Sequence, residues 1–172
     1  MRAILALLIV GAWLVTPCAS AERFTSERPS PLKRLKPSQA DGNGARFAGS
    51  VQLAGQFLIV HHRKNPGLPV WQVTFFPDAA SAALLPHPVD EKAVSELDFS
   101  NREPAVAMLR DLATVENKLA DGGSSLAGAA TVTIRSYRTE VLCDHRWYLA
   151  ELVSVTKGQP LVVSAHAGDR GC

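Results

Sequence analysis

The sequence lacks every short motif that marks a known kind of reaction. No serine stands in a G-x-S-x-G turn, and no glycine-rich loop of the phosphate-binding type is present. No histidine, cysteine or carboxylate residues follow the spacing of zinc ligands. We therefore expect no metal site, no cofactor and no identifiable catalytic residue. Internal repeats and an alternation of strands with helices are also missing, so a doubly wound sheet is not expected.

Apolar residues form no run long enough to cross a membrane. The run Ala3 to Val15 holds 13 residues, and as a helix it rises about 20 Å, short of a hydrocarbon core of roughly 30 Å. Arg2 precedes this run and the small residues Ala19-Ser20-Ala21 follow it, which is the pattern of a secretory signal peptide. We expect residues 1–21 to be removed, and the mature protein to be periplasmic or secreted.

Cys18 allows a second interpretation of the N-terminal segment. A bacterial lipoprotein signal also ends at a cysteine, which becomes lipid-modified. Small residues normally precede that cysteine, whereas Val15, Thr16 and Pro17 precede Cys18. A soluble mature protein is therefore favoured, and a lipid-anchored envelope protein is the alternative.

The mature chain is almost neutral and keeps two cysteines. Residues 22–172 hold 17 Lys and Arg and all 16 Asp and Glu, a net charge of +1. Nucleic acid is therefore not an expected partner, because binding it needs a strongly basic surface. Cys143 and Cys172 remain after cleavage, and an even pair in an oxidising compartment usually forms a disulfide. The bridge would close a loop of about 30 residues and stabilise the fold by about 3 kcal/mol.

The pattern along the chain predicts a leader and one domain. Residues 22–46 are proline-rich and basic, with little apolar periodicity, and are interpreted as a flexible leader. The single globular domain spans 47–172. Within it, alternating polarity predicts a strand or hairpin over 47–62 and strands over 70–76, 130–137 and 147–156, with a short edge strand over 161–165. A helix follows Ser100 or Asn101. Two or three strands thus precede the helix, and two or three follow it. Gly49 and Gly55 interrupt the first strand, which is typical of a bulge or a sharp bend.

The predicted order of elements is β-β-β-α-β-β in a mainly β protein with one helix. This order, with its glycine-bent first strand, resembles a five-stranded barrel of the OB type. An α+β fold with an antiparallel sheet and one packed helix is the alternative.

A group of basic and aromatic residues is the candidate binding surface. Such residues interleaved on one hairpin are what an OB-type face uses to hold ligands. The group consists of Arg135, Tyr137, Arg138, Arg146 and Trp147. We expect an exported binding or scaffolding domain of the bacterial cell envelope, without catalysis, whose partner is a protein, a peptide or a glycan. The alternative is an envelope-directed hydrolase with a site assembled from His61 or His62 and Asp144 with His145.

The mass of the mature protein tests both the cleavage and the disulfide. We expect the mass of residues 22–172, lowered by two hydrogen atoms and restored by reductant, in electrospray spectra of protein purified from the envelope fraction. An N-terminal lipid-modified Cys18 contradicts the cleavage site, and a mass that reductant leaves unchanged contradicts the disulfide.

Overall fold

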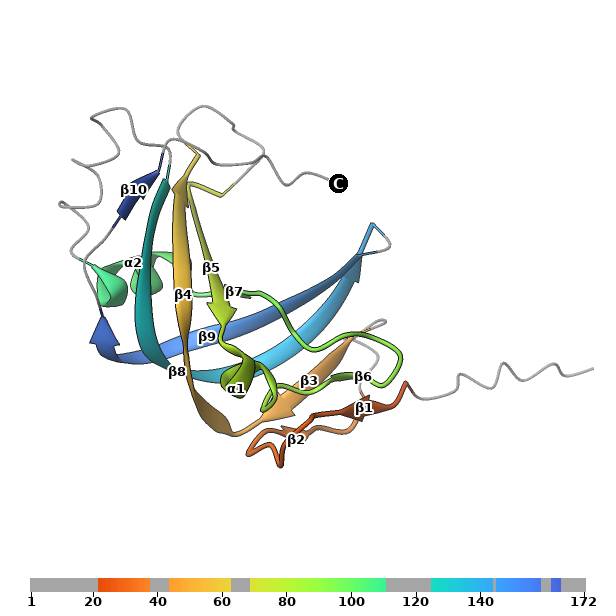
Figure 1. The fold of residues 1–172 in the computed structure, drawn as a ribbon. Helices are drawn as coiled ribbons and strands as arrows, with labels where there is room; N and C mark the ends of the chain where they lie inside the picture. The colour runs from red at the N-terminus through yellow and green to blue at the C-terminus, as the bar shows by residue number, and fades with distance from the viewer. Residues whose placement is uncertain are drawn as a thin grey trace, which may run out of the picture.

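A large mixed β-sheet makes up most of the molecule (Figure 1). The computed structural model describes residues 22–37, 44–62, 69–110, 125–143, 145–158 and 162–164. The predicted signal peptide, Cys18, Asp144 and Cys172 lie outside these residues. The sheet has the strand order β2-β3-β8-β4-β5-β7-β9, and β9 also pairs with β8. The prediction of a mainly β protein is confirmed.

Two antiparallel strands with alternating polarity form the first half of the sheet. β4 (Ser50–His61) pairs with β5 (Trp71–Pro77) from Gly55↔Pro77 to His61↔Trp71. Val51, Leu53, Phe57 and Ile59 are buried, whereas Ser50, Gln52 and Gln56 are exposed, as the alternation predicts. The short strand β7 (Leu97–Phe99) extends this half, because it pairs with β5.

The second half of the sheet is built on two long strands. β8 (Ser125–Leu142) pairs with β4 along its first part and with β3 (Ala45–Ala48) near its end. β9 (His145–Gly158) returns antiparallel to β8 and also pairs in parallel with β7. The sheet is therefore mixed, unlike the antiparallel sheet of the alternative prediction. The strand β10 (Val162–Ser164) pairs with the start of β8, within the predicted strand 161–165.

The segment before Phe47 differs from the predicted flexible leader. Within residues 22–37 and 44–46, β1 (Phe24–Thr25) pairs with β6 (His87–Pro88), and β2 (Lys33–Arg34) pairs with β3. Leu32 and Ala45 are buried in the core. Figure 1 shows this segment lying across the far half of β8 and β9. We name residues 22–37 the N-terminal strap. The prediction missed it because its strands are only two residues long and carry no readable periodicity.

Two helices are described where the sequence predicted one. α1 (Ala79–Ala82) is a single turn, and the Asp78 carboxylate accepts a hydrogen bond from the Ser81 amide at 2.8 Å. α2 (Arg102–Leu109) lies between β7 and β8, and it begins after Asn101 as predicted. The Asn101 side chain does not cap this helix. It binds the backbone of Leu152 on β9 through two hydrogen bonds of 2.9 Å. The rest of the predicted helix lies outside the described residues.

The hydrophobic core lies against one face of the sheet, which we call the inner face. Phe57, Phe75, Phe99, Ile134 and Leu152 are all but inaccessible there. α2 adds Val106 and Leu109, so this helix packs its apolar side against the strands. The polar residues that alternate with these buried residues along the strands lie on the opposite face, which we call the outer face.

A glycine at a sharp bend separates β3 from β4. Gly49 has a φ of +109°, and a Cβ at this position would lie 2.7 Å from the carbonyl oxygen of Pro31 in the strap. The predicted bend at Gly49 is confirmed. Because of the bend, β8 pairs with β4 before this point and with β3 after it.

Replacing this glycine should destabilise the protein. We expect Gly49→Ala to lower the free energy of unfolding by about 2 kcal/mol, because the new Cβ meets both a positive φ and a backbone oxygen. Ser50→Ala, at the exposed neighbouring position, should change it by less than about 0.5 kcal/mol. Urea denaturation measures both variants, and equal stability of the two would contradict the strained bend.

Candidate functional site

A β-bulge in β8 determines which side chains of this strand share a face. Arg135 pairs with Glu151 on β9, and Arg138 pairs with Leu149, so three steps along β8 match two along β9. Ser136 has a φ of 51° at this irregularity. The extra residue exchanges the two faces: Val132 and Ile134 are buried before it, and Tyr137 and Thr139 are buried after it.

The bulge therefore places Arg135 and Arg138 on the same outer face. In a regular strand, residues three apart point to opposite faces. Arg46 of β3 joins them, because it is the register partner of Arg138 and is exposed. The bend at Gly49 and the bulge at Ser136 lie next to each other, because Ser50 is the register partner of Arg135.

A cleft of about 640 Å³ lies at this place. We call it the arginine cleft. Residues of β3 and β8 on both sides of the bend and the bulge line it. Its lining includes Leu35, Arg46, Arg135, Ser136, Arg138 and Glu140.

Each of two arginines is held by a carboxylate at one nitrogen. Arg135 donates from Nε to Glu151 at 2.8 Å, and Arg138 donates from Nε to Glu140 at 2.8 Å. A guanidinium has five N–H donors, four of them on the terminal Nη atoms. Among the described residues, the Nη atoms of these two arginines make no hydrogen bond. The carboxylates thus orient the two arginine side chains, and the Nη groups remain available as hydrogen-bond donors.

Tyr137 is one of the residues that line the cleft, but its side chain is buried and offers no exposed ring for stacking, contrary to the predicted binding group. Its side chain has no exposed area, and its hydroxyl donates to the carbonyl oxygen of Pro86 at 2.8 Å. The ring lies against Phe47 and Tyr148. Burial raises the pKa of the Tyr137 hydroxyl well above its usual value. Tyr137 therefore supports the inner face beneath the cleft.

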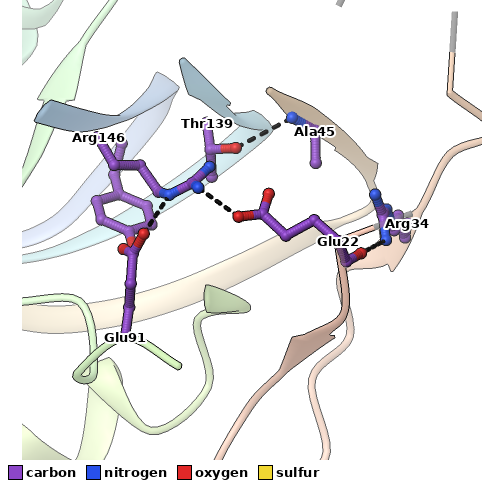
Figure 2. Close-up of polar contacts among 7 residues, drawn as sticks. Glu22, Arg34, Ala45, Glu91, Thr139 and Arg146 are labelled. Carbon is purple, nitrogen blue, oxygen red and sulfur yellow. Dashed lines mark hydrogen bonds and ion pairs between the residues drawn. The ribbon is translucent and has the colours of Figure 1, made fainter. Parts of the chain in front are cut away.

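Arg146 also lies on the inner face, away from the arginine cleft. Figure 2 shows its guanidinium between Glu22 of the strap and Glu91 of the connection that follows β6. The Nε–Glu91 distance is 2.7 Å, and the arginine side chain is only 12% exposed. Burial alone would lower the pKa of Arg146, but the hydrogen bond and charge of Glu91 and the charge of Glu22 outweigh it and raise the pKa.

The same cluster ties the strap to the sheet at further points. Arg34 donates to the carbonyl oxygen of Glu22, as Figure 2 shows, and its guanidinium lies 4.7 Å from the ring centre of Phe24. Tyr148 donates to Glu91 at 2.9 Å. Burial and this hydrogen bond raise the pKa of the Tyr148 hydroxyl. Arg146 is thus a structural residue that joins three segments.

Trp147 is half-buried at the border of the outer face. It pairs across the strands with Glu140, and its ring meets His145 edge-on at 5.2 Å between ring centres. Its Nε1 is buried and has no hydrogen-bond partner among the described residues. Trp147 therefore flanks the cleft on the side of Glu140 without lining it.

One carboxyl group on the outer face has a raised pKa. Burial disfavours the charged form of Asp98 and raises its pKa, although the Thr74 hydroxyl donates to its Oδ1 at 2.5 Å and opposes the rise. Asp98 and Arg138 pair with Leu149 from its two sides. They are therefore two strand spacings apart, about 10 Å, and Asp98 is not part of the arginine cleft.

The histidines of the predicted hydrolase site are not brought together. His61 ends β4 beside the start of β8, whereas His145 faces the far end of β8 at Leu142. These ends are about 55 Å apart along the strand. His61 stacks on Trp71, and His62 contacts Gln72. Within the described ranges, no three histidine, cysteine or acidic residues are placed to hold a metal ion.

Cys143 occupies the turn between β8 and β9, with a φ of 52°. It has an interaction partner. Cys172 lies outside the described residues, so the pairing of the two cysteines stays a prediction.

Sequence reasoning missed several residues that line the cleft, among them Arg46 and Leu35. Both fell within the interval that was interpreted as a leader. The signal for Arg46 was present, because Ala45 and Phe47 have the parity of the buried residues and Arg46 has the other. Leu35 follows β2 directly, and its side chain is 48% exposed. Nothing in the local sequence marks it.

Comparisons with protein-family models, curated proteins and solved structures give no match to this chain. None of the helices in the described part of the chain has the length and apolar character needed to span a bilayer.

Removing the buried arginine should destabilise the protein more than removing an exposed one. We expect Arg146→Ala to lower the free energy of unfolding by about 2 kcal/mol, since it leaves Glu22 and Glu91 without their cation. Arg135→Ala is the matched control: it breaks one ion pair whose arginine is 63% exposed, and should cost less than about 0.5 kcal/mol.

Thermal and urea denaturation of the two variants give the comparison. Losses of equal size would mean that Arg146 does not anchor the strap.

Proposed function

We propose that the chain is exported to the periplasm or secreted, and that residues 22–172 are a small, non-catalytic binding domain of the bacterial cell envelope. Its ligand binds in the arginine cleft. The partner is a protein, a peptide or a glycan of the envelope, and no nucleic acid is expected, because residues 22–172 carry a net charge of only +1.

We further propose that five strands of the sheet form an OB-like barrel. The pairings β8–β4, β4–β5, β5–β7, β7–β9 and β9–β8 support it, because each of the five strands has two partners in a ring. The five ring strands and α2 follow the order β4-β5-β7-α2-β8-β9 along the chain, with the short elements α1 and β6 between β5 and β7. Apart from these two elements, the order matches the expected β-β-β-α-β-β. Such barrels carry binding surfaces for many unrelated ligands.

The single observation that carries the binding proposal is the placement of Arg46, Arg135 and Arg138 around one cleft. A bulge is a costly irregularity that tends to occur next to functional sites, where it redirects a side chain. Here it brings two arginines to one face, and two carboxylates hold them in place. Groups that are ordered before binding lose less conformational entropy on binding.

Photo-crosslinking in the cells that make the protein tests this function. A photoreactive phenylalanine analogue replaces Leu35 or Ala48, both in the cleft and both exposed, or Val89 or Met108, which are exposed elsewhere. We expect an adduct of constant mass from the two cleft positions and none from the two control positions. Because the four positions are similarly accessible, random collision would label all of them.

An adduct pattern that does not depend on position would overturn the proposed binding site. The absence of any adduct at both cleft positions would do the same.

A further inference from the structure

We propose that the arginine cleft binds an uncharged saccharide, whose hydroxyl groups form hydrogen bonds with the ion pairs Arg135–Glu151 and Arg138–Glu140. This inference rests on the proposed function, because it selects the glycan among the three kinds of partner proposed above. Three features of the cleft carry it: the balance of charge, the hydrogen-bonding groups, and the pairing of the strands that line it.

The charges at the cleft compensate one another. Arg135 donates to Glu151 and Arg138 donates to Glu140, each from Nε at 2.8 Å. Arg46, the third arginine of the lining, has an interaction of its own. A charged ligand would meet a like charge as well as an opposite charge at each ion pair, whereas a neutral ligand meets no repulsion. The ion pairs therefore favour an uncharged ligand over an anion or a cation.

Each ion pair presents donors and acceptors side by side. The pairs of Arg135 and Arg138 each use one guanidinium nitrogen and one carboxylate oxygen. Among the described residues, the Nη groups and the second carboxylate oxygen of each pair make no other hydrogen bond. A hydroxyl group can both donate and accept. Two neighbouring hydroxyls of a sugar can therefore accept from the guanidinium and donate to the carboxylate of one pair, and hydrogen bonds to charged groups are the stronger ones.

The rest of the lining suits the same kind of ligand. Ser136 lines the cleft at the bulge and is exposed, so its hydroxyl adds a further donor and acceptor. Leu35 is 48% exposed and Ala48 is exposed as well, so the lining also includes apolar surface. A sugar ring has C–H groups on its faces and hydroxyls at its edge. It can therefore contact apolar side chains while its hydroxyls reach the ion pairs.

The strands that line the cleft are paired on both sides, which disfavours an extended peptide. β3 lies between β2 and β8, and β8 also pairs with β9. A peptide that binds by strand addition needs an unpaired edge, and these strands do not offer one at the cleft. A volume of about 640 Å³ lies within the range of small-molecule sites, whereas a protein partner needs a wider contact surface. A saccharide therefore fits the cleft better than the other two kinds of partner.

Titration of the processed mature protein with soluble probes tests this inference. The probes are two neutral tetrasaccharides, maltotetraose and chitotetraose. Tetra-alanine with blocked termini is the peptide control, and inorganic phosphate is the anion control. NMR spectra of the arginine side chains report binding at Nε of Arg135 and Arg138. We expect saturable shifts with at least one tetrasaccharide and with neither control. The saccharide affinity should change by less than about twofold between about 0.05 and about 0.5 M salt, because salt does not screen a neutral ligand.

A glutamate variant separates a saccharide from an anion. Glu140→Gln replaces a charged acceptor with a neutral one, and should weaken saccharide binding by about tenfold. The same variant would strengthen the binding of an anion. Arg138→Gln should also weaken saccharide binding by about tenfold. Glu27→Gln and Arg28→Gln are the matched controls, because both residues are exposed in the strap and do not line the cleft. Backbone spectra that overlay with those of the unmodified protein verify that each variant is folded.

Two results would overturn the saccharide site. One is the absence of saturable shifts at Arg135 and Arg138 with both tetrasaccharides. The other is a saccharide affinity that is the same in Glu140→Gln and in Glu27→Gln. A cleft-specific adduct in cells together with either result would exclude the saccharide and leave the binding function. Saturable saccharide binding without a cleft-specific adduct would instead exclude the binding function in the cell.

Discussion

The change of face at the bulge in β8 is the constraint on which the proposed site depends. Before Ser136 the buried residues of this strand are Val132 and Ile134, and after it they are Tyr137 and Thr139. The same extra residue bends β8 where it exchanges β4 for β3 as a neighbour. Without the bulge, Arg138 would point into the core, and Tyr137 would lose its hydrogen bond to Pro86. This one bulge thus places Tyr137 in the core on the inner face and Arg138 on the outer face.

Much of the sheet could be predicted from alternation alone, because burial on one face imposes a period of two. The strands that contain Val51, Val73 and Ile134 follow this period, and the buried residues are the predicted ones. The bend at Gly49 was also predictable, because glycine interrupts the buried parity there. The N-terminal strap was not, because two-residue strands show no period and are ordered by contacts such as the Glu22–Arg146 ion pair, which join segments far apart in the sequence.

The fold separates the residues of the candidate binding group for a related reason. Arg135, Tyr137 and Arg138 were chosen by composition, and all three are among the residues that line the arginine cleft. The side chains of Tyr137 and Arg146 nevertheless lie on the inner face. For Tyr137, the added bulge residue reverses the parity that the alternation of β8 would assign. Arg146 has the parity of the buried Ala150 and Leu152 on β9. The buried ion pairs of Arg146 show that a basic residue on a hairpin can serve the fold alone.

A crystal structure of the mature protein tests the central claim most directly. The account predicts that Arg46, Arg135 and Arg138 lie on one face of the sheet, around one cleft. Arg135 and Arg138 on opposite faces of β8 would contradict the bulge.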